Sequence, residues 1–238
     1  MQILSFDIDR GVYHFNLSGL ETGTHSHPAT ELIIAKHGSF TLETASGAKE
    51  NLSSAIIAPN TPHSFHGTDA DCHFLMFEWH DFAYIAHSAG FSSGQNISGS
   101  DKPVDLSKIT AFANALSKPK RSADARINTC LDILDQQTAG TSKPLEYLSS
   151  RVHLSPGRLS HLFKQEVGIS LRKYVNWALL RNTISYFLHS GSTLTDSSLN
   201  AGFYDSPHFT RHFKQYFGVR PSLPYNSQIV QVPGKAGA

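Results

Sequence analysis

The chain has 238 residues, of which 39% are hydrophobic and 16% are charged, and its formal net charge is +1. This length allows one large domain or two of ordinary size, with enough apolar content for a packed core in each. No apolar run approaches the ~18 residues that span a membrane, and the acidic residues within Met1–Arg10 do not fit a secretory signal. We therefore expect a globular, cytoplasmic protein with no membrane contact.

The two halves of the chain differ in charge. Residues 1–141 carry 9 Lys and Arg against 15 Asp and Glu, a net −6, whereas residues 142–238 carry 11 against 4, a net +7. This asymmetry predicts separate tasks, with a polyanionic partner for the basic half. Cys72 and Cys130 have neither a zinc nor a redox spacing, and we expect both to be buried thiols.

Short strand-like runs fill the first part of the chain. They are rich in β-branched and aromatic residues, and clusters of Gly, Pro, Asn and Ser separate them. The runs are Val12–Phe15, Glu31–Ala35, Ser39–Glu43, Ala55–Ala58 and His73–Trp79. Their spacing predicts an all-β domain, a sandwich or a barrel, over residues 1–95.

A loop and one helix are expected next, in residues 96–120. The Gly- and Ser-rich stretch Ser92–Ser100 indicates the loop, and apolar residues at helical spacing follow from Val104 to Leu116. This amphipathic helix could pair two copies of the chain or pack on its own β-domain. We favour the homodimer.

Two stretches of the basic half repeat each other fifty residues apart, Arg158–Gly168 and His208–Gly218. A helix-capping residue precedes each copy, Ser155 in one and Asp205 in the other. The matched pairs are Leu159 and Phe209, Phe163 and Phe213, Lys164 and Lys214, Gln165 and Gln215, and Gly168 and Gly218. A repeat of this kind predicts a duplicated helix-turn-helix unit.

In each unit the apolar positions share one face of the second helix, so the opposite face is free to bind a partner. These outward residues are small, polar or cationic, which suits contacts with bases and phosphates. They are Gly157, Arg158, Ser160, His161, Lys164, Ser206, His208, Thr210, Arg211 and Lys214. A long helix from Leu171 to Leu188 joins the units; as a rigid spacer of ~25 Å it would let them enter successive major grooves of double-stranded DNA.

Residues 121–226 resemble the DNA-binding domain of the AraC/XylS family of bacterial transcription regulators, and Ala201–Pro221 matches its C-terminal signature. We expect residues 227–238, beyond this domain, to form a flexible tail. The resemblance implies seven helices with two helix-turn-helix units. It places base contacts on Gly157, Ser160, His161, Ser206, Pro207, Thr210 and Arg211.

The chain departs from that family at three positions. Leu179 stands where an Arg is usual, and Ser197 and Ser198 stand where Ile and Ala usually pack the second unit. Burying two hydroxyls without partners costs about 1 to 3 kcal/mol each. We therefore expect the second unit to be the looser one.

Histidines and one carboxylate recur at a distinctive spacing in the acidic half. The segment His25-Ser-His27 is followed by Glu31, and His63 follows the turn Pro59–Pro62. Imidazole and carboxylate groups suit Zn, Ni, Mn or Fe(II). The spacing resembles the first motif of the cupin superfamily, a small jelly-roll β-barrel, and the resemblance places metal ligands on His25, His27, Glu31 and His63.

Two alternatives stay open for these residues, a metal site and a pattern without a metal. The sensor domains of AraC-type regulators resemble cupins, and many keep this pattern with no metal assigned. No cofactor is therefore required. The resemblance also implies a pocket for a small-molecule effector, lined by Tyr13, Phe15, His25, His27, Glu31 and Phe77.

The expected architecture is an α+β multidomain chain, a cupin-like β-barrel followed by an all-α domain with two helix-turn-helix units. The leading prediction for its function is a non-enzymatic transcription regulator that binds promoter DNA, responds to an effector and has RNA polymerase as a further partner. One alternative is a metal-dependent cupin enzyme with an appended helical domain. Another is a regulator whose barrel serves only dimerisation.

Overall fold

The computed structural model describes residues 2–119, 121–136 and 144–221, so the predicted tail over residues 227–238 lies outside the described residues. The chain divides into two compact units. Among the described residues, one unit consists of residues 2–119 and 213–221, and the other consists of residues 121–136 and 144–212. Within the described ranges, no helix is both long and apolar enough to cross a membrane.

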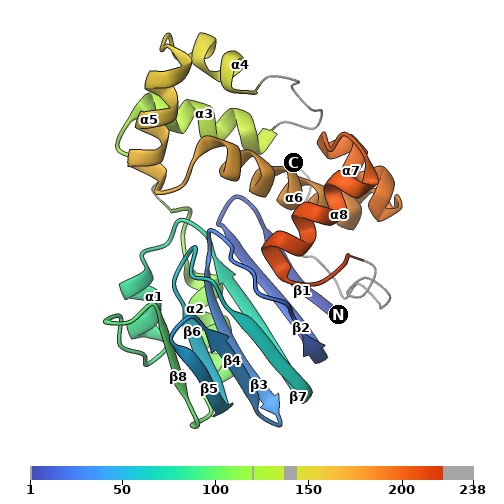
Figure 1. The fold of residues 1–238 in the computed structure, drawn as a ribbon. Helices are drawn as coiled ribbons and strands as arrows, with labels where there is room; N and C mark the ends of the chain where they lie inside the picture. The colour runs from blue at the N-terminus through green and yellow to red at the C-terminus, as the bar shows by residue number, and fades with distance from the viewer. Residues whose placement is uncertain (1, 120, 137–143, 222–238) are drawn as a thin grey trace. The chain divides into compact units, whose positions relative to one another are not determined.

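The first unit is an antiparallel sheet with two helices (Figure 1). Its strands are β1 (Gln2–Asp7), β2 (Val12–Glu21), β3 (Thr30–His37), β4 (Phe40–Thr44), β5 (Gly47–Leu52), β6 (Ser54–Ile57), β7 (Ser64–Phe77) and β8 (Ile97–Ser100), and its helices are α1 (Phe82–Ser88) and α2 (Leu106–Ala115). The hydrogen-bonded order is β1-β2-β7-β3-β6-β8, and β4 pairs with both β5 and β7. The predicted all-β domain is confirmed. Strands β1, β5 and β8 and helix α1 were not among the predicted elements.

The long strand β7 decides which side chains share a face of the sheet. It pairs with β2 on one side and β3 on the other, so that Tyr13 and Glu31 both lie opposite Met76. Directly opposite residues of an antiparallel pair project to the same face. One face therefore carries Tyr13, Glu31 and Met76, and the other carries Val12 and Phe77, which also lie opposite each other.

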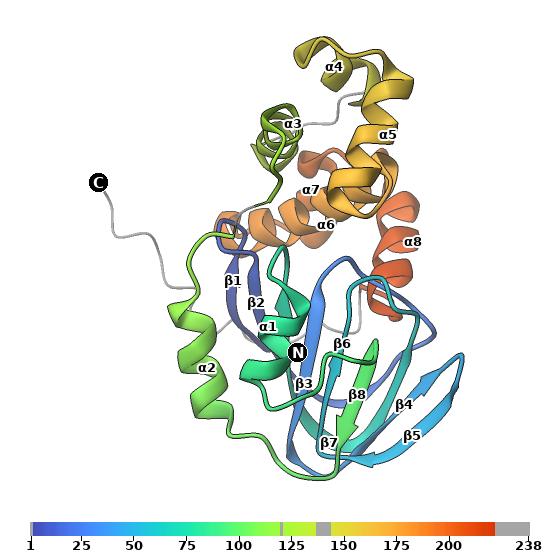
Figure 2. The same ribbon diagram turned by 90° about the vertical axis from the view of Figure 1, so that its left-hand side faces the viewer.

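The face that carries Val12 and Phe77 is covered by α1 and α2 (Figure 2). A buried cluster joins the sheet to these helices. Its members are Val12, Leu32, Ile34, Ile56, Leu75, Phe77, Ile85, Ala86, Ala89, Ile109 and Ala113. The apolar face of α2 thus packs on its own sheet, which is the less favoured of the two alternatives for this helix.

Two expectations are corrected by this arrangement. Phe77, predicted to line an effector pocket, lies in the cluster beneath α1 and α2 because strand alternation turns it away from Tyr13. The predicted end of the β-domain at residue 95 is too early. Strand β8 pairs with β6 and buries Ile97, and α2 packs on the sheet, so both belong to the first unit and not to a linker.

A pair of buried histidines makes the first unit sensitive to acid. The Nε2 atom of His14 lies 2.9 Å from Nδ1 of His73. Burial, and then the charge of His73, lower the pKa of His14 from 6.5 to about 4. Between these two values the unfolded chain binds the proton more strongly than the folded chain does, so stability is full above the higher value and falls as the pH falls.

When the pH is lowered from about 7 to about 6, we expect His14 to reduce the free energy of unfolding of the first compact unit by about 0.7 kcal/mol. The variant His14→Gln should lose this part of the pH dependence, measured by urea unfolding at both pH values. As a control, His37→Gln removes an exposed histidine of β3 and should keep the slope of the unmodified chain. Equal slopes in all three proteins would contradict the prediction.

The second unit and the rest of α8 hold the predicted helical domain. Its helices are α3 (Ala125–Gln136), α4 (Pro144–Arg151), α5 (Pro156–Val167), α6 (Leu171–Ser190), α7 (Leu194–Ala201) and α8 (Ser206–Phe217). These are six of the seven helices that the resemblance implies, counted over the described residues. The predicted long helix is confirmed as α6, and its N-cap Ser170 accepts a hydrogen bond from the Lys173 backbone N–H.

Candidate functional site

The first helix-turn-helix unit consists of α4 and α5. Ser155 caps α5, its hydroxyl accepting from the Arg158 backbone N–H at 3.4 Å, and Pro156 occupies the first turn, where it forfeits no hydrogen bond. Leu159 and Phe163 are fully buried. Gly168 ends the helix in the left-handed conformation at φ 80°, which a glycine adopts without steric cost.

The second helix-turn-helix unit, α7 and α8, is built in the same way. The Asp205 carboxylate accepts a 2.7 Å hydrogen bond from the backbone N–H of His208, and Phe209 and Phe213 are buried at 2% and 3% exposure. Gly218 again follows the helix with a positive φ, 71°. The matched positions of the sequence repeat therefore have the same structural roles in both helix-turn-helix units.

The turns of the two units differ by one residue. Each begins with a left-handed residue, His153 in one and Gly202 in the other, and the next backbone N–H reaches back to a Ser carbonyl at 3.0 Å. The cap of α5 comes two residues after His153, whereas the cap of α8 comes three residues after Gly202. The additional residue is Tyr204, which is 88% exposed and which the fifty-residue repeat does not mark.

His153 adopts φ 54°, a left-handed conformation that is unfavourable for a residue with a Cβ atom but almost without cost for a glycine. We expect His153→Gly to stabilise the helical domain by about 0.5 to 1 kcal/mol, measured as a higher urea midpoint. The matched change at Gly202, Gly202→Ala, should destabilise it, because φ there is 106°. If His153→Gly lowers the midpoint, the side chain has a stabilising role that outweighs backbone strain.

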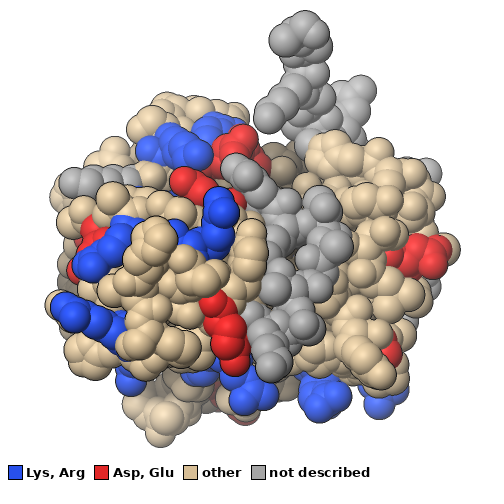
Figure 3. All heavy atoms as spheres, turned by 90° about the horizontal axis from the view of Figure 1, so that it is seen from above, with Lys and Arg blue, Asp and Glu red and all other residues tan. Residues whose placement is uncertain are grey.

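Every residue predicted to contact DNA is at least partly accessible. Gly157, Arg158, His161, Lys164, Pro207, Arg211 and Lys214 are exposed, and Ser160, Ser206, His208 and Thr210 are half-buried. Figure 3 shows Lys and Arg side chains at several separate places on one face of the molecule, with Asp and Glu between some of them.

The reason for expecting a looser second helix-turn-helix unit, two hydroxyls buried without partners, does not hold. Ser197 and Ser198 are fully buried, as expected from the resemblance, which places packed Ile and Ala at these positions. Their hydroxyls are satisfied, however, because each donates to a backbone carbonyl of its own helix region, Ser197 to Thr193 at 2.8 Å and Ser198 to Thr195 at 2.7 Å. The penalty for unpartnered hydroxyls does not apply.

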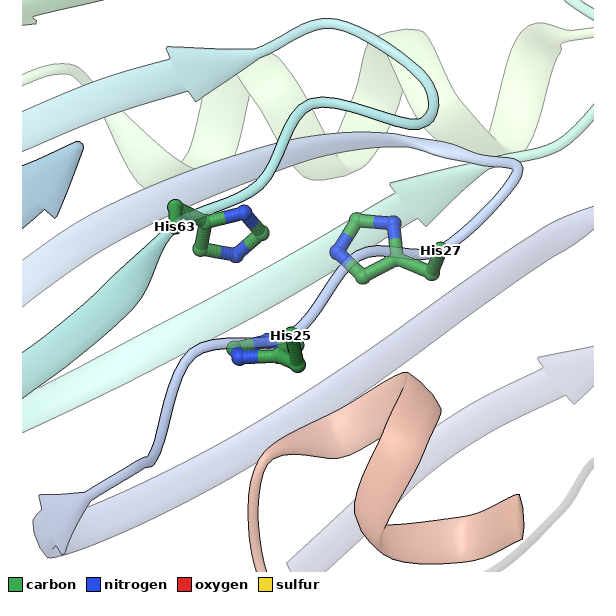
Figure 4. Close-up of side chains that lie close together, drawn as sticks. All are labelled: His25, His27 and His63. Carbon is green, nitrogen blue, oxygen red and sulfur yellow. The ribbon is translucent and has the colours of Figure 1, made fainter. Parts of the chain in front are cut away.

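The sheet domain brings together three histidines predicted from the sequence, His25, His27 and His63 (Figure 4). Their candidate ligand atoms all lie within 4.8 Å of one another, and all three residues are buried. His25 and His63 exchange two backbone hydrogen bonds, at 2.9 and 3.0 Å, which fixes the loop before β3 beside the start of β7. Glu31 completes the predicted set, with Oε2 3.4 Å from His27 Nε2 and 3.2 Å from His63 Nε2.

Backbone carbonyls fix the orientation of all three rings. Nδ1 of His25 lies 3.0 Å from the Gly23 carbonyl, that of His27 lies 2.9 Å from the Ala29 carbonyl, and that of His63 lies 2.9 Å from the Thr61 carbonyl. A carbonyl only accepts, so each Nδ1 carries a hydrogen. In the neutral ring Nε2 is then an acceptor, as in most metal-binding histidines.

The electrostatics of the cluster favour a positive charge beside Glu31. Burial raises the pKa of Glu31, but the adjacent imidazoles of His27 and His63 outweigh it and hold that pKa well below its ordinary value. Burial lowers the pKa of His63, yet the adjacent Glu31 carboxylate raises it overall. Burial and the two other histidines lower the pKa of His25 to about 3.

Two of the other predicted pocket residues, Tyr13 and Phe15, are buried, at 1% and 7% exposure. They share a face of β2, and the Tyr13 hydroxyl donates a 2.7 Å hydrogen bond to the Glu78 carboxylate. Glu78 is only 1% exposed. It lies directly after β7, where no sequence motif marked it, and it adds a second buried acid to the side of the sheet that carries Glu31.

Comparisons with known proteins agree with the duplicated helical unit. A family model described as a helix-turn-helix domain matches residues 148–223. The transcriptional activator RhaS of Escherichia fergusonii is 30% identical over 108 residues, which are 45% of this chain and 38% of RhaS. The arabinose operon regulatory protein of Escherichia coli is 27% identical over 117 residues, which are 49% of this chain and 39% of that protein. The matches thus span less than half the length of either relative.

The fold of the whole chain also has a known counterpart. The structure of ToxT from Vibrio cholerae aligns with 92% of this chain and 97% of its own at a TM-score of 0.54, with 11% sequence identity. This likeness extends the comparison to the β-domain, at the level of fold. Residues 148–223 thus match a helix-turn-helix domain and are similar in sequence to these regulators, and the chain as a whole is similar in fold to ToxT.

Proposed function

We propose that this protein is a cytoplasmic, sequence-specific DNA-binding regulator of transcription. The observation that carries the proposal is the duplicated helix-turn-helix, in which both α5 and α8 bury matched apolar residues and leave small polar and cationic side chains accessible. A cationic face binds phosphates, and short polar groups and Arg211 reach base edges. The relatives named as a transcriptional activator and an operon regulator support this role.

The β-domain is proposed to bind a small-molecule effector. Support comes from the buried polar groups on one face of the sheet, Tyr13, Glu31 and Glu78, and from a ToxT structure described as bound to an unsaturated fatty acid. A homodimer and contact with RNA polymerase are further proposals. Thermal unfolding of the full chain across a panel of metabolites tests the effector, because a ligand that binds only the folded state raises the unfolding temperature. No shift with any metabolite would favour a β-domain that serves only dimerisation.

DNA binding is tested by selecting fragments of bacterial genomic DNA with the purified full chain. We expect a set of fragments that share a motif, bound with an affinity that falls steeply as salt rises, because each neutralised phosphate releases counterions. Salt-sensitive association without any shared motif would reduce the protein to a non-specific DNA binder. If no fragment associates with the chain, the proposal is contradicted.

We also propose that His25, His27, His63 and Glu31 hold a divalent metal ion. The supporting observation is that Nε2 of His27 and of His63 is buried and faces Glu31 without forming a geometrically sound hydrogen bond. With the ring hydrogens on Nδ1, unprotonated Nε2 atoms would place lone pairs against a carboxylate, which is unfavourable unless a cation lies between them. Three imidazoles and one carboxylate suit Zn, Ni, Mn or Fe(II). Such an ion would tie the loop before β3 to the start of β7.

Metal analysis of the purified chain tests this site. We expect one equivalent of bound divalent metal that His27→Asn abolishes, whereas His37→Asn, at an exposed histidine of β3, should leave it in place. Equal metal content in the two variants and the unmodified chain would contradict the site. Conversion of a small molecule that needs this metal, with DNA binding unaffected by its loss, would favour the enzyme alternative.

A further inference from the structure

A second group of histidines lies on α8. His208 and His212 are one helical turn apart, and their Nε2 atoms are 3.1 Å from each other. The two rings meet at a steep angle with centroids 4.7 Å apart, and both lie near the ring of Phe203, at 5.3 and 6.2 Å. Both residues are half-buried. Packing against Phe203 therefore restricts the rotamers of the pair.

The helix-turn-helix architecture does not require this pair. In the first helix-turn-helix unit the matched positions, fifty residues earlier, are Arg158 and Leu162, neither of which has an imidazole. The buried positions of α8 that the repeat does preserve are Phe209 and Phe213. His208 and His212 lie on the flank between this buried face and the exposed Arg211. The histidine pair thus occurs in the second helix-turn-helix unit and not at the matched positions of the first.

The separation of the two nitrogen atoms suits a shared metal ion. Two imidazole nitrogens that bind one ion at about 2.0 to 2.1 Å are about 2.9 Å apart at a right angle and about 3.3 Å apart at a tetrahedral angle. The observed 3.1 Å lies between these values. Histidines at positions i and i+4 also share a helix face, which is how helical metal sites present two ligands.

We propose that His208 and His212 form a bidentate site for a divalent transition-metal ion, binding Cu²⁺ most tightly and Ni²⁺ and Zn²⁺ less tightly, with water as the remaining ligand. The order follows the general affinity of nitrogen ligands for these ions. In the metal-free pair, one Nε2–H donates to the other Nε2. A metal ion takes the place of that hydrogen, which moves to Nδ1 of the same ring.

Nδ1 of His208 is able to carry that hydrogen. It is buried and, among the residues that the structure describes, has no hydrogen-bond partner that would require it to be an acceptor. The site also has a consequence that rests on the proposed function. A bound ion would place two positive charges beside Arg211, on the helix that is expected to enter the major groove, and so couple DNA affinity to metal supply.

The test measures Cu²⁺ binding to the full chain by equilibrium dialysis and electron paramagnetic resonance, without DNA, so that its outcome is independent of the proposed function. We expect His208→Gln and His212→Gln each to lose one equivalent that the unmodified chain binds. The control His189→Gln, at an exposed histidine of α6, should retain it. Loss of that equivalent should leave the one abolished by His27→Asn unchanged.

Equal Cu²⁺ uptake by the unmodified chain, His208→Gln and His212→Gln would overturn the proposal. A second measurement needs no variant and so does not depend on their folding. In the unmodified chain, the Nε2 resonances of His208 and His212 should shift together as Zn²⁺ is added, followed by nitrogen-15 magnetic resonance. Independent shifts, or no shift at either nitrogen when zinc is in excess, would equally overturn it.

Discussion

Replacing Asp135 with Ala should destabilise the helical domain by about 3 to 5 kcal/mol. Asp135, on α3, holds two buried cations. Its Oδ2 atom lies 2.5 Å from Nη1 of Arg121, and its Oδ1 atom lies 2.8 Å from Nη2 of Arg181. The two arginine side chains are 7% and 1% exposed. The Arg181 guanidinium also donates to the Tyr174 hydroxyl at 3.0 Å, so the network joins α3 to the long helix α6.

The size of this effect comes from the two positive charges that the substitution leaves behind. A buried ion pair contributes little net stability compared with apolar residues of the same shape, but removal of one partner leaves an uncompensated charge in a medium of low polarity. Here one carboxylate serves two guanidinium groups. The loss should therefore lie well above that of an ordinary surface substitution.

Urea unfolding of the full chain, followed by circular dichroism at the helical band, measures this loss. The matched control is Asp132→Ala, one turn earlier on α3. Asp132 lies 3.5 Å from the same Arg121, but its side chain is 60% exposed. We expect the control to change the free energy of unfolding by less than about 1 kcal/mol. If the two variants unfold at the same urea concentration, the buried network does not stabilise the domain as argued.

The second large effect is expected at the proposed DNA interface. Arg211→Ala should weaken binding to the selected sequence by about 1 to 3 kcal/mol and relax the preference at one base position. Arg211 is exposed on α8, and a guanidinium that donates two hydrogen bonds to a guanine distinguishes it from the other bases. The measurement is a titration of the full chain against the selected site and a set of single-base variants of that site.

Lys214→Ala provides the comparison, because Lys214 is exposed one turn along the same helix. A lysine that only neutralises a phosphate should weaken binding evenly across sequences and reduce the salt dependence by about one counterion. An even loss across all sequences for Arg211→Ala as well would remove Arg211 from specificity and leave it a phosphate contact. Normal far-UV spectra of both variants would show that the helix itself is intact.

Local sequence patterns were sufficient to predict the helical half. The fifty-residue repeat, the caps Ser155 and Asp205 and the matched glycines indicated two helix-turn-helix units, and all these features have the expected role. The reason is that helix caps, apolar periodicity and terminal glycines act over three to four residues. Such short-range rules survive in any tertiary setting that keeps the helix.

The sequence predicted the composition of the histidine cluster but not its geometry. The spacing of His25, His27, Glu31 and His63 suggested a shared site, and the structure brings them together. The carbonyls that orient each ring come from loop conformation, which no spacing encodes. Glu78 gave no signal, since its burial depends on the register between β2 and β7.

Tertiary contacts also reversed several expectations. Strand register placed Phe77 under α1 and α2, because a shift of one residue along a strand exchanges the two faces of a sheet. The hydroxyls of Ser197 and Ser198 found carbonyl partners, and Asp135 came to lie between two arginines distant in sequence. Residue spacing thus predicted the helices of both helix-turn-helix units, several strands and many of the polar groups that these elements present. Only the packing of distant segments decided which of those groups are buried, satisfied or paired, because burial and pairing depend on neighbours that local sequence does not specify.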